Sequence, residues 1–347
     1  MGCSFSGMNA MYDSASGGGD VWINENRFRI IRKIGDDGSS ASVFLVKEIA
    51  SNPPISGGTF ALHKVKNPSH VSDDGTYAMK KVNIQTEQKL DVVRHEINVS
   101  SMFNHPNLLP LLDHAIIPVK SSKDNSTNYE AYLLFPVHLD GTLLDIGKIM
   151  QSRNEFFDTL TVLQLFRQLC AGLKHMHDFD PPYFHGDVKT GNILITQKKT
   201  QTYPIAILMD FGSATPAKMQ IRTQSEALQL QEWASKNSHA PFRAPELWNC
   251  STHADIDQRI DIWSLGCTFY AIMYGVSPFE YVPFETEEDM KVAITTVDIK
   301  WPSGPDPPYP ESLRQFVKWM LQPQPSIRPN IDDIIIHVDK LISKFTS

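Results

Sequence analysis

The chain has 347 residues with a formal net charge of −7, and 41% of its residues are hydrophobic. This size exceeds that of a usual single hydrophobic core and favours two lobes or two domains. The acidic balance argues against nucleic acid as a partner, since phosphate backbones need clustered Lys and Arg, and the lack of a run of about 18 apolar residues argues against a transmembrane segment.

The amino terminus carries a lipidation signal. The chain begins MGCSFS, which fits the myristoylation pattern in which loss of the first Met exposes Gly2. One acyl chain binds a membrane only marginally, so palmitoylation of Cys3 would supply the second anchor. The alternative is a tail that is never acylated. Residues 1–24, with a Ser- and Gly-rich spacer at 7–20, are predicted to form a flexible, acylated segment.

The first half of the chain has the pattern of a small β-rich lobe. Residues 28–34 and 43–46 are β-like and flank a turn, and a further strand is predicted over 76–82. A helix is expected over 86–103, and residues 133–135 form a short apolar strand.

The second half has helical patterns. A capping-box match at Thr161 predicts the start of one helix, and residues 262–274 are apolar all round and end at Gly275, as expected of a buried helix. A last amphipathic helix is predicted over 331–345. Strands first and helices later predict an α+β fold in two lobes.

A helical insert is expected near residue 230. Thr223 and Glu226 match a second capping box. The apolar face that follows consists of Ala227, Leu230, Trp233 and Ala234. An exposed face would indicate a docking surface and a buried one internal packing, and packing is the interpretation we favour.

Two short motifs carry the groups needed for phosphoryl transfer. The first, FHGDVKTGN, supplies Asp187, Lys189 and Asn192, and the second, MDFG, supplies Asp210. A base, a cation and two oxygen ligands for a metal ion are what moving a γ-phosphate from ATP to a hydroxyl requires.

The order and spacing of these motifs resemble eukaryotic protein kinases over residues 28–345. With the lipidation signal, the FNHPN segment at 103–107 and the helical insert, the chain is similar to the Numb-associated kinase family. The resemblance implies a two-lobed fold, with an antiparallel β lobe and one main helix at 28–136 and a larger, mostly helical lobe at 142–345. It further implies a serine/threonine protein kinase that uses ATP and Mg²⁺, including possible autophosphorylation.

The resemblance assigns catalytic roles to matching residues. Lys80, in the strand motif AMK, would reach the phosphates of ATP and be held by Glu96. A similar strand at 60–65 would place His63 in that position, but its spacing from Glu96 does not fit the kinase pattern.

Four further residues would serve the transfer itself. Asp187 would be the base and Lys189 would neutralise the transferring phosphoryl group. Asn192 and Asp210 would bind Mg²⁺.

The same resemblance predicts the nucleotide contacts. Phe135 would guard the adenine pocket, and the backbone N–H of His138 would donate to the adenine. The full set expected to contact the nucleotide is Ile34, Gly35, Gly38, Val43, Ala78, Lys80, Phe135, His138, Asn192 and Asp210.

Two departures from the kinase pattern stand out. The phosphate loop is short of glycines and carries Asp36 and Asp37, which would repel a polyanion and weaken ATP binding. Gly186 stands where most kinases have an Arg that pairs with a phosphorylated segment, which predicts activity without a phosphate switch. Alternatively, Gly186 only relaxes the backbone and other cations preserve such regulation.

These departures leave a rival function, a pseudokinase that binds nucleotide and acts as a scaffold. A small-molecule kinase is disfavoured by the Ala-Pro-Glu segment at 244–246, whose Glu246 is expected to pair with Arg328. Asp261 is expected to bond the backbone of the catalytic loop. The expected partners are ATP, a protein substrate and a membrane surface, at the cytoplasmic face of Golgi, other endomembranes or the plasma membrane.

Overall fold

The computed structural model describes residues 19–36, 41–49, 72–120, 127–197, 201–281, 283–303 and 309–346. The chain divides into two compact units, the first made of residues up to 104 together with 109–138, and the second of 105–108 together with residues from 139 onward. One unit is built on an antiparallel sheet and the other mainly on helices, so the predicted α+β class is confirmed.

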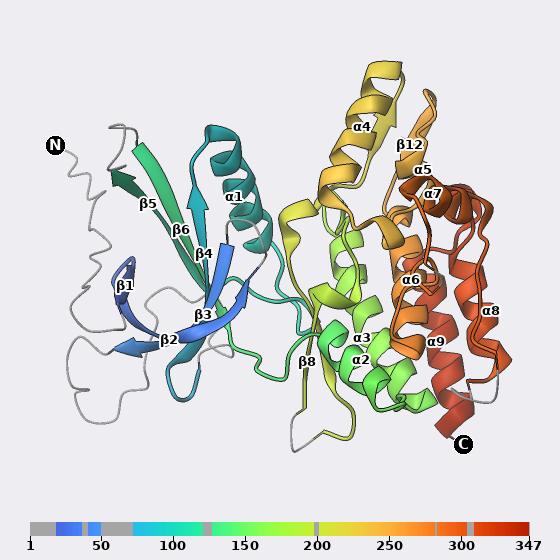
Figure 1. The fold of residues 1–347 in the computed structure, drawn as a ribbon, viewed down its shortest axis with the longest axis horizontal. Coiled ribbons are helices and arrows are strands. Elements are labelled where there is room, and N and C mark those ends of the chain that lie inside the picture. The colour runs from blue at the N-terminus through green and yellow to red at the C-terminus, as the bar shows by residue number, and fades with distance from the viewer. Residues whose placement is uncertain are drawn as a thin grey trace. The chain divides into compact units, whose positions relative to one another are not determined.

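The first unit is an antiparallel sheet with a helix on one face (Figure 1). The strand order is β1-β2-β3-β4-β6-β5. The strands are β1 (Asp20–Ile23), β2 (Asn26–Asp36), β3 (Ala41–Ile49), β4 (Thr76–Ile84), β5 (Asp113–Lys120) and β6 (Thr127–Pro136). The helix α1 (Glu87–Ser100) begins after Thr86, whose side chain accepts a hydrogen bond from the Lys89 N–H at 3.2 Å.

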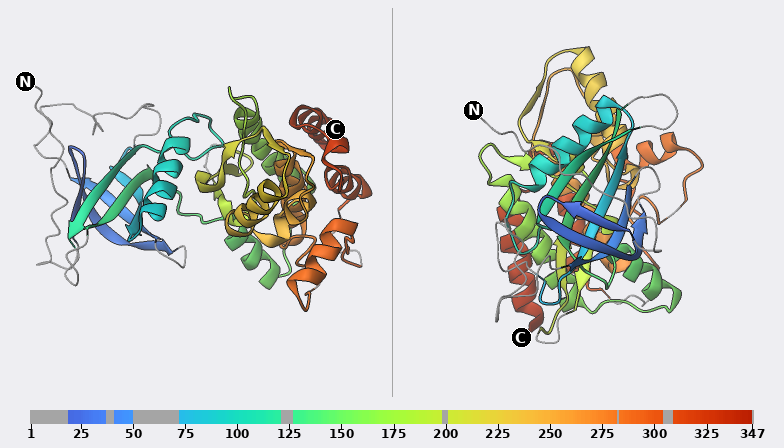
Figure 2. Two further views of the ribbon diagram at one scale, coloured as in Figure 1. Left: turned by 90° about the horizontal axis from the view of Figure 1, so that it is seen from above. Right: turned by 90° about the vertical axis from the view of Figure 1, so that its left-hand side faces the viewer.

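Alternation along β4 sets which residues face the helix. Tyr77 and Met79 pack in the core on one face of the sheet, whereas Val82 and Ile84 pack with α1 residues on the other. Because side chains alternate along a strand, Lys80 shares the face of Val82. Figure 2 shows α1 lying against that sheet.

Strand β1 differs from the sequence-based prediction. The segment 1–24 was predicted to be flexible, yet Val21 and Ile23 are fully buried and β1 pairs with β2. Asp20 accepts a hydrogen bond from Arg29 Nε at 3.0 Å, which fixes the start of the strand. A strand of four residues is too short for its alternation to stand out beside a Ser- and Gly-rich stretch. The predicted lipidation sites Gly2 and Cys3 lie outside the described residues.

The second unit is built around α6 (Arg259–Tyr274). Every residue from Ile260 to Tyr274 is buried, and Gly275 ends the helix with φ of 84°. A residue with positive φ is the common helix terminator, so the predicted buried helix and its end are confirmed. The other helices are α2 (Leu143–Ser152), α3 (Thr159–His177), α4 (Gln224–Asn237), α5 (Pro245–Trp248), α7 (Glu287–Thr296), α8 (Glu311–Met320) and α9 (Ile331–Thr346).

The second unit also contains short antiparallel pairs of strands. They are β7 (Tyr183–Phe184) with β10 (Thr215–Pro216), β8 (Ile193–Thr196) with β9 (Ile205–Leu208), and β11 (Met219–Ile221) with β12 (Ala254–Ile256). None of the helices in the described part of the chain has both the length and the apolarity needed to span a bilayer.

The start of α3 differs from the prediction, whereas that of α4 is confirmed. The N-cap of α3 is Asp158, not Thr161, and its carboxylate accepts from the Thr161 N–H at 2.9 Å and the Thr161 hydroxyl at 2.6 Å. The Asp158 carboxylate therefore caps the helix, and Thr161 lies inside it as the third helical residue, whose N–H donates to the cap. At α4, Thr223 and Glu226 form the predicted capping box.

Candidate active site

In the first unit, the structure brings Lys80 and Glu96 together. Lys80 Nζ lies 2.6 Å from Glu96 Oε1, and the Glu96 side chain is 9% exposed. Lys80 comes from β4 and Glu96 from the buried face of α1, beside Val93 and Ile97. A buried carboxylate is tolerated when it is paired, so this ion pair presents an ammonium group in a fixed place on the sheet. The competing strand at 60–65 lies outside the described residues.

The other expected nucleotide contacts of this unit lie on the same strands. Val43 on β3 is the neighbour of Lys80, and Ala78 on β4 is the neighbour of Phe135 on β6. Phe135 packs against the core on the α1 side of the sheet, and His138 follows the end of β6. Ile34 and Gly35 lie near the end of β2, whereas Gly38 lies outside the described residues.

The charge on the glycine-poor loop is partly balanced. Asp36 forms an ion pair with Lys33 and accepts a hydrogen bond from the Ser42 hydroxyl at 3.4 Å. Both members of the ion pair are exposed, so it contributes little to stability, but it reduces the negative potential near the end of β2. Asp37 lies outside the described residues.

In the second unit, three donors converge on the carboxylate of Asp187. Its Oδ2 accepts from Lys189 Nζ at 2.6 Å and from Asn192 Nδ2 at 2.9 Å, and its Oδ1 accepts from the backbone N–H of His239 at 3.0 Å. The Asp187 side chain is 11% exposed. The donors fix the direction of the carboxylate while part of it remains accessible, as a catalytic base requires.

The side chain of Asp261 fixes the loop that carries Asp187. This fully buried carboxylate on α6 accepts from the backbone N–H groups of His185 at 2.7 Å and Gly186 at 2.9 Å, and bonds His177 Nε2 at 2.9 Å. The predicted contact of Asp261 with the loop backbone is therefore confirmed. Hydrogen bonds to an ionised group are the stronger kind, so Asp261 is a rigid support for the loop.

His185 links the same loop to the residue before Asp210. Its ring is fully buried, with Nε2 3.2 Å from the Met209 carbonyl oxygen and Nδ1 accepting from the Asp187 N–H at 3.2 Å. These two contacts fit a neutral ring protonated at Nε2. The two sequence motifs are thus joined through one imidazole.

Asn192 and Asp210 lie at one end of the β8–β9 hairpin. Ile193 pairs with Leu208, and the Met209 N–H donates to the Asn192 carbonyl at 2.9 Å, so the two residues flank the same end. The Asn192 amide nitrogen bonds Asp187, which leaves its side-chain oxygen for another partner. Asp210 has φ of 68° and an exposed side chain.

This donor set fits a hard divalent cation. Mg²⁺ binds through one or two protein oxygens together with phosphate and water oxygens, and the amide oxygen and the carboxylate supply the protein share. Within the described ranges, no group of three or more His, Cys, Asp or Glu could hold a metal without such help.

Gly186 has two physical reasons to be glycine. Its φ is 81°, a conformation that costs other residues about 1–2 kcal/mol. A Cβ there would lie 3.0 Å from the Ser213 carbonyl oxygen and 3.2 Å from Cη2 of Trp233. Trp233 of α4 therefore fills the space beside the loop. Its ring also packs edge to face on Phe184, with the ring centroids 5.9 Å apart.

The apolar face of α4 is mainly a packing surface. Ala227, Leu230 and Ala234 are buried, and Trp233 is partly buried against the loop. The packing interpretation of the insert is thus confirmed for these residues, although Leu228 on the opposite side is 55% exposed.

The predicted pair of Glu246 and Arg328 is confirmed. Arg328 Nη1 and Nη2 donate to Glu246 Oε1 and Oε2 at 2.7 and 2.6 Å, and the Arg328 side chain is fully buried. Its remaining donors bond carbonyl oxygens of Gln322, Pro323 and Arg259. This bidentate pair fixes the start of α5 against the segment before α9.

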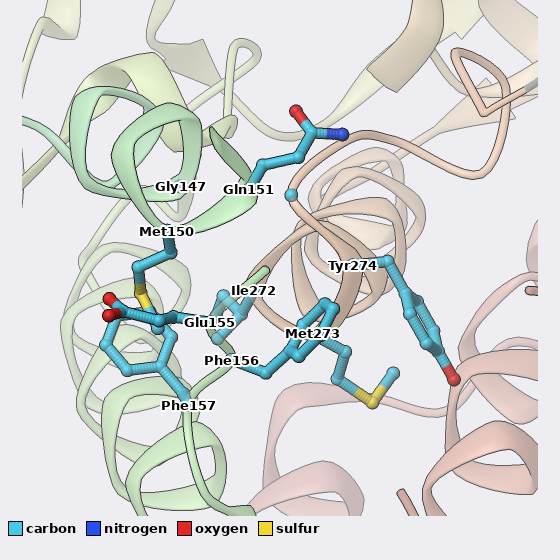
Figure 3. Close-up of a pocket in the computed structure, with 10 residues that line it drawn as sticks. Gly147, Met150, Gln151, Glu155, Phe156, Phe157, Ile272, Met273 and Tyr274 are labelled. Carbon is cyan, nitrogen blue, oxygen red and sulfur yellow. The ribbon is translucent and has the colours of Figure 1, made fainter. Parts of the chain in front are cut away.

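A small apolar pocket between α2 and the end of α6 does not belong to this site (Figure 3). Met150, Phe156, Ile272 and Met273 are among the residues that line it. Its free volume of about 20 Å³ holds roughly one water molecule, so it has no room for a nucleotide.

Sequence reasoning missed His185 and His239 as parts of the site. His185 stands inside the first motif, and its position two residues before Asp187 was the available signal. His239 contributes a backbone N–H across 52 residues of chain, and no local pattern marks a backbone donor.

Comparison with known proteins identifies one domain family and several relatives of similar length. The protein kinase domain family matches residues 53–338. Serine/threonine-protein kinase 16 of Rattus norvegicus is 30% identical over 323 residues, which cover 93% of both chains. The protein of the same name from Homo sapiens is 29% identical over the same share, and serine/threonine-protein kinase ppk13 of Schizosaccharomyces pombe is 26% identical over 93% of both chains.

Proposed function

Because the chain belongs to the protein kinase family and is a serine/threonine protein kinase that uses ATP and a divalent cation, we propose a role for each group of the site. Asp187 orients the substrate hydroxyl and accepts its proton, and Lys189 neutralises charge on the transferring phosphoryl group. The observation that carries this proposal is the convergence of Lys189, Asn192 and the His239 N–H on one carboxylate.

The phosphates of ATP are proposed to bind Lys80, which Glu96 holds in place. The 2.6 Å ion pair and the low exposure of Glu96 support this role. A preorganised ammonium group loses little freedom when it meets a phosphate oxygen, so it favours transfer over mere binding.

The divalent cation is proposed to be Mg²⁺, held by Asn192 and Asp210. The free amide oxygen of Asn192 and the adjacent carboxylate of Asp210 support this assignment. When bound, the ion would neutralise phosphate charge, while Asn192 keeps its amide nitrogen on Asp187.

The adenosine part of ATP is proposed to contact residues of the first unit. Phe135 guards the adenine, and the His138 backbone N–H donates to it. The apolar and glycine contacts are Ile34, Gly35, Gly38, Val43 and Ala78.

The test of these roles is replacement of Asp187 by Asn. We expect the variant to lose about 10²–10⁴ of the rate of phosphate incorporation from labelled Mg-ATP into a generic basic protein and into the kinase itself. The thermal unfolding midpoint should remain near that of the parent, since Asn keeps the size of the side chain. Full activity in Asp187→Asn would reject the proposed base, whereas the lack of incorporation by the parent protein itself would favour the pseudokinase alternative.

Lipid anchoring is a separate part of the proposal. Myristoyl at Gly2 and palmitoyl at Cys3 would hold the kinase at the cytoplasmic face of a membrane, of which Golgi and other endomembranes are the first candidates. The MGCSFS start supports it. Gly2→Ala should move the protein from the membrane fraction to the soluble fraction, and unchanged fractionation would contradict the anchor.

Membership of the Numb-associated kinases, and activity without a phosphate switch, complete the proposal. The helix α4, which lies between the MDFG motif and the Ala-Pro-Glu segment, supports the family membership, and the contact of Trp233 with the loop at Gly186 supports the activity without a switch. Phosphatase treatment should leave activity intact, and its loss would show that a phosphorylated segment is needed.

A further inference from the structure

His239 lies at the point where α4 gives way to the short 3₁₀ helix η4 (Ala240–Phe242). Its backbone N–H donates to Asp187 Oδ1 at 3.0 Å. The segment after α4 therefore reaches the carboxylate directly, without a side chain between them.

The donors to Asp187 are unevenly shared between its two oxygens. A carboxylate has about four acceptor sites, two on each oxygen. Lys189 and Asn192 occupy those of Oδ2, and the His239 N–H occupies one of Oδ1. Among the donors that the described residues supply, this leaves an acceptor site on Oδ1, beside the His239 N–H.

The position of His239 is fixed by its neighbours. Its ring stacks on Phe242 with centroids 6.0 Å apart and an angle of 29° between the planes, and its carbonyl oxygen accepts from the Phe242 N–H at 2.9 Å. The next residues are held in turn, because the Pro241 carbonyl oxygen accepts from the buried Ser277 hydroxyl at 2.7 Å. The N–H is thus presented by a rigid turn.

The ring adds no charge to the site near neutral pH. Partial burial, and then the neighbouring Lys189, lower the pKa of His239, an effect that Arg243 supports and that Asp187 and Glu280 oppose. Lys189 is therefore the cation next to the carboxylate, and the contribution of His239 to Asp187 is its N–H.

We propose that His239 is a positioning residue for phosphoryl transfer, whose N–H turns the Asp187 carboxylate so that Oδ1 faces the acceptor hydroxyl. The oxygen of the acceptor hydroxyl forms the new bond to the γ-phosphorus, and the bond from that phosphorus to the leaving ADP oxygen breaks. The proton of the hydroxyl passes to Asp187 Oδ1 in the same step. The inference rests on the proposed role of Asp187.

The backbone at this position allows a direct test. His239 has φ of −72° and Ser238 has φ of −129° and ψ of 136°, values that suit proline and the residue before it. His239→Pro removes the N–H together with the ring, whereas His239→Ala removes the ring alone. The proline Cδ would, however, take the place of the hydrogen and clash with Asp187 Oδ1, so the matched comparison is between His239→Ala and lactic acid at position 239, which gives an ester that lacks the N–H and otherwise matches His239→Ala.

We expect kcat of the ester variant to be about tenfold or more below that of His239→Ala, with the same KM for ATP, because a hydrogen bond to an ionised group is lost. A purely structural loss would also raise KM for ATP or lower the thermal unfolding midpoint.

Equal kcat in the ester variant and in His239→Ala would overturn the inference. Asp187→Asn is measured in parallel. Its inactivity with no difference between the position-239 variants rejects the inference alone, and its full activity rejects the proposed base as well.

Discussion

The two units hold their functional groups in different ways. In the first unit, one ion pair joins Lys80 on a strand to Glu96 on a helix, and both elements follow from local patterns. In the second unit, Asp187 is held by residues on its own loop and by a backbone donor far along the chain. A site made of two regular elements depends on few residues, whereas a site made of loops depends on everything that shapes those loops.

The largest effect should come from breaking the pair in the first unit. Lys80→Met keeps the length of the side chain but removes its charge, and we expect kcat/KM for ATP to fall about 10²–10³-fold, as for loss of a preorganised donor. Lys81→Met is the matched control, because Lys81 is the next residue of β4 and pairs with Glu130 at 2.8 Å. Steady-state kinetics of both variants decide the matter, and equal losses would mean that the charge of the strand, not the pair, matters.

A smaller effect is expected where α4 meets the loop of the second unit. Gly186→Ala must adopt a positive φ and contact the Ser213 carbonyl oxygen, so we expect the free energy of unfolding to fall by about 1–2 kcal/mol or more. Gly147→Ala is the control, since Gly147 lies inside α2 and its Cβ would meet only atoms of Gly275, at 3.9 Å. Urea unfolding measures both variants.

The contact of Trp233 with this loop can be tested in the same background. If the ring limits the space at position 186, then the costs of Gly186→Ala and Trp233→Ala should not add, because removing the ring relieves part of the clash. Additive costs would show that the backbone conformation alone requires glycine.

The smallest effect concerns the cap of α3. We expect Asp158→Ala to lower the free energy of unfolding by about 1 kcal/mol, because Asp158 accepts the Thr161 N–H. Gln164, three residues after Thr161, would complete a capping box if Thr161 were the cap, so Gln164→Ala should leave that free energy nearly unchanged. The reverse result in urea unfolding would restore Thr161 as the cap.

The cap should also depend on pH. Burial raises the pKa of Asp158, but hydrogen bonds from Thr161 outweigh this and hold the pKa below its usual 3.8. A carboxyl with a lowered folded-state pKa stabilises fully above the unfolded pKa and loses its effect as pH falls through the folded value. The difference between parent and Asp158→Ala should therefore disappear at strongly acid pH.

How far the sequence predicts the molecule follows from these cases. The Lys80–Glu96 pair, the buried α6 and the cap of α4 could be predicted because a period, a spacing or a cap motif specifies each one. The cap of α3 was misplaced because Asp158 and Thr161 both match a cap, and only the three-dimensional structure shows which one accepts. The contact of the His239 N–H with Asp187 could not be predicted, because a backbone donor has no residue preference.

The pair of Arg328 and Glu246 makes the carboxyl-terminal part of the chain indispensable. A stop codon near residue 320 would remove Arg328 and leave the largely buried Glu246 carboxylate without a counter-ion. Removing one member of such a pair is among the most destabilising single losses, so we expect the truncated product to aggregate rather than to persist as a shorter enzyme. Recovery of the truncated chain in the soluble fraction with kinase activity would contradict this expectation.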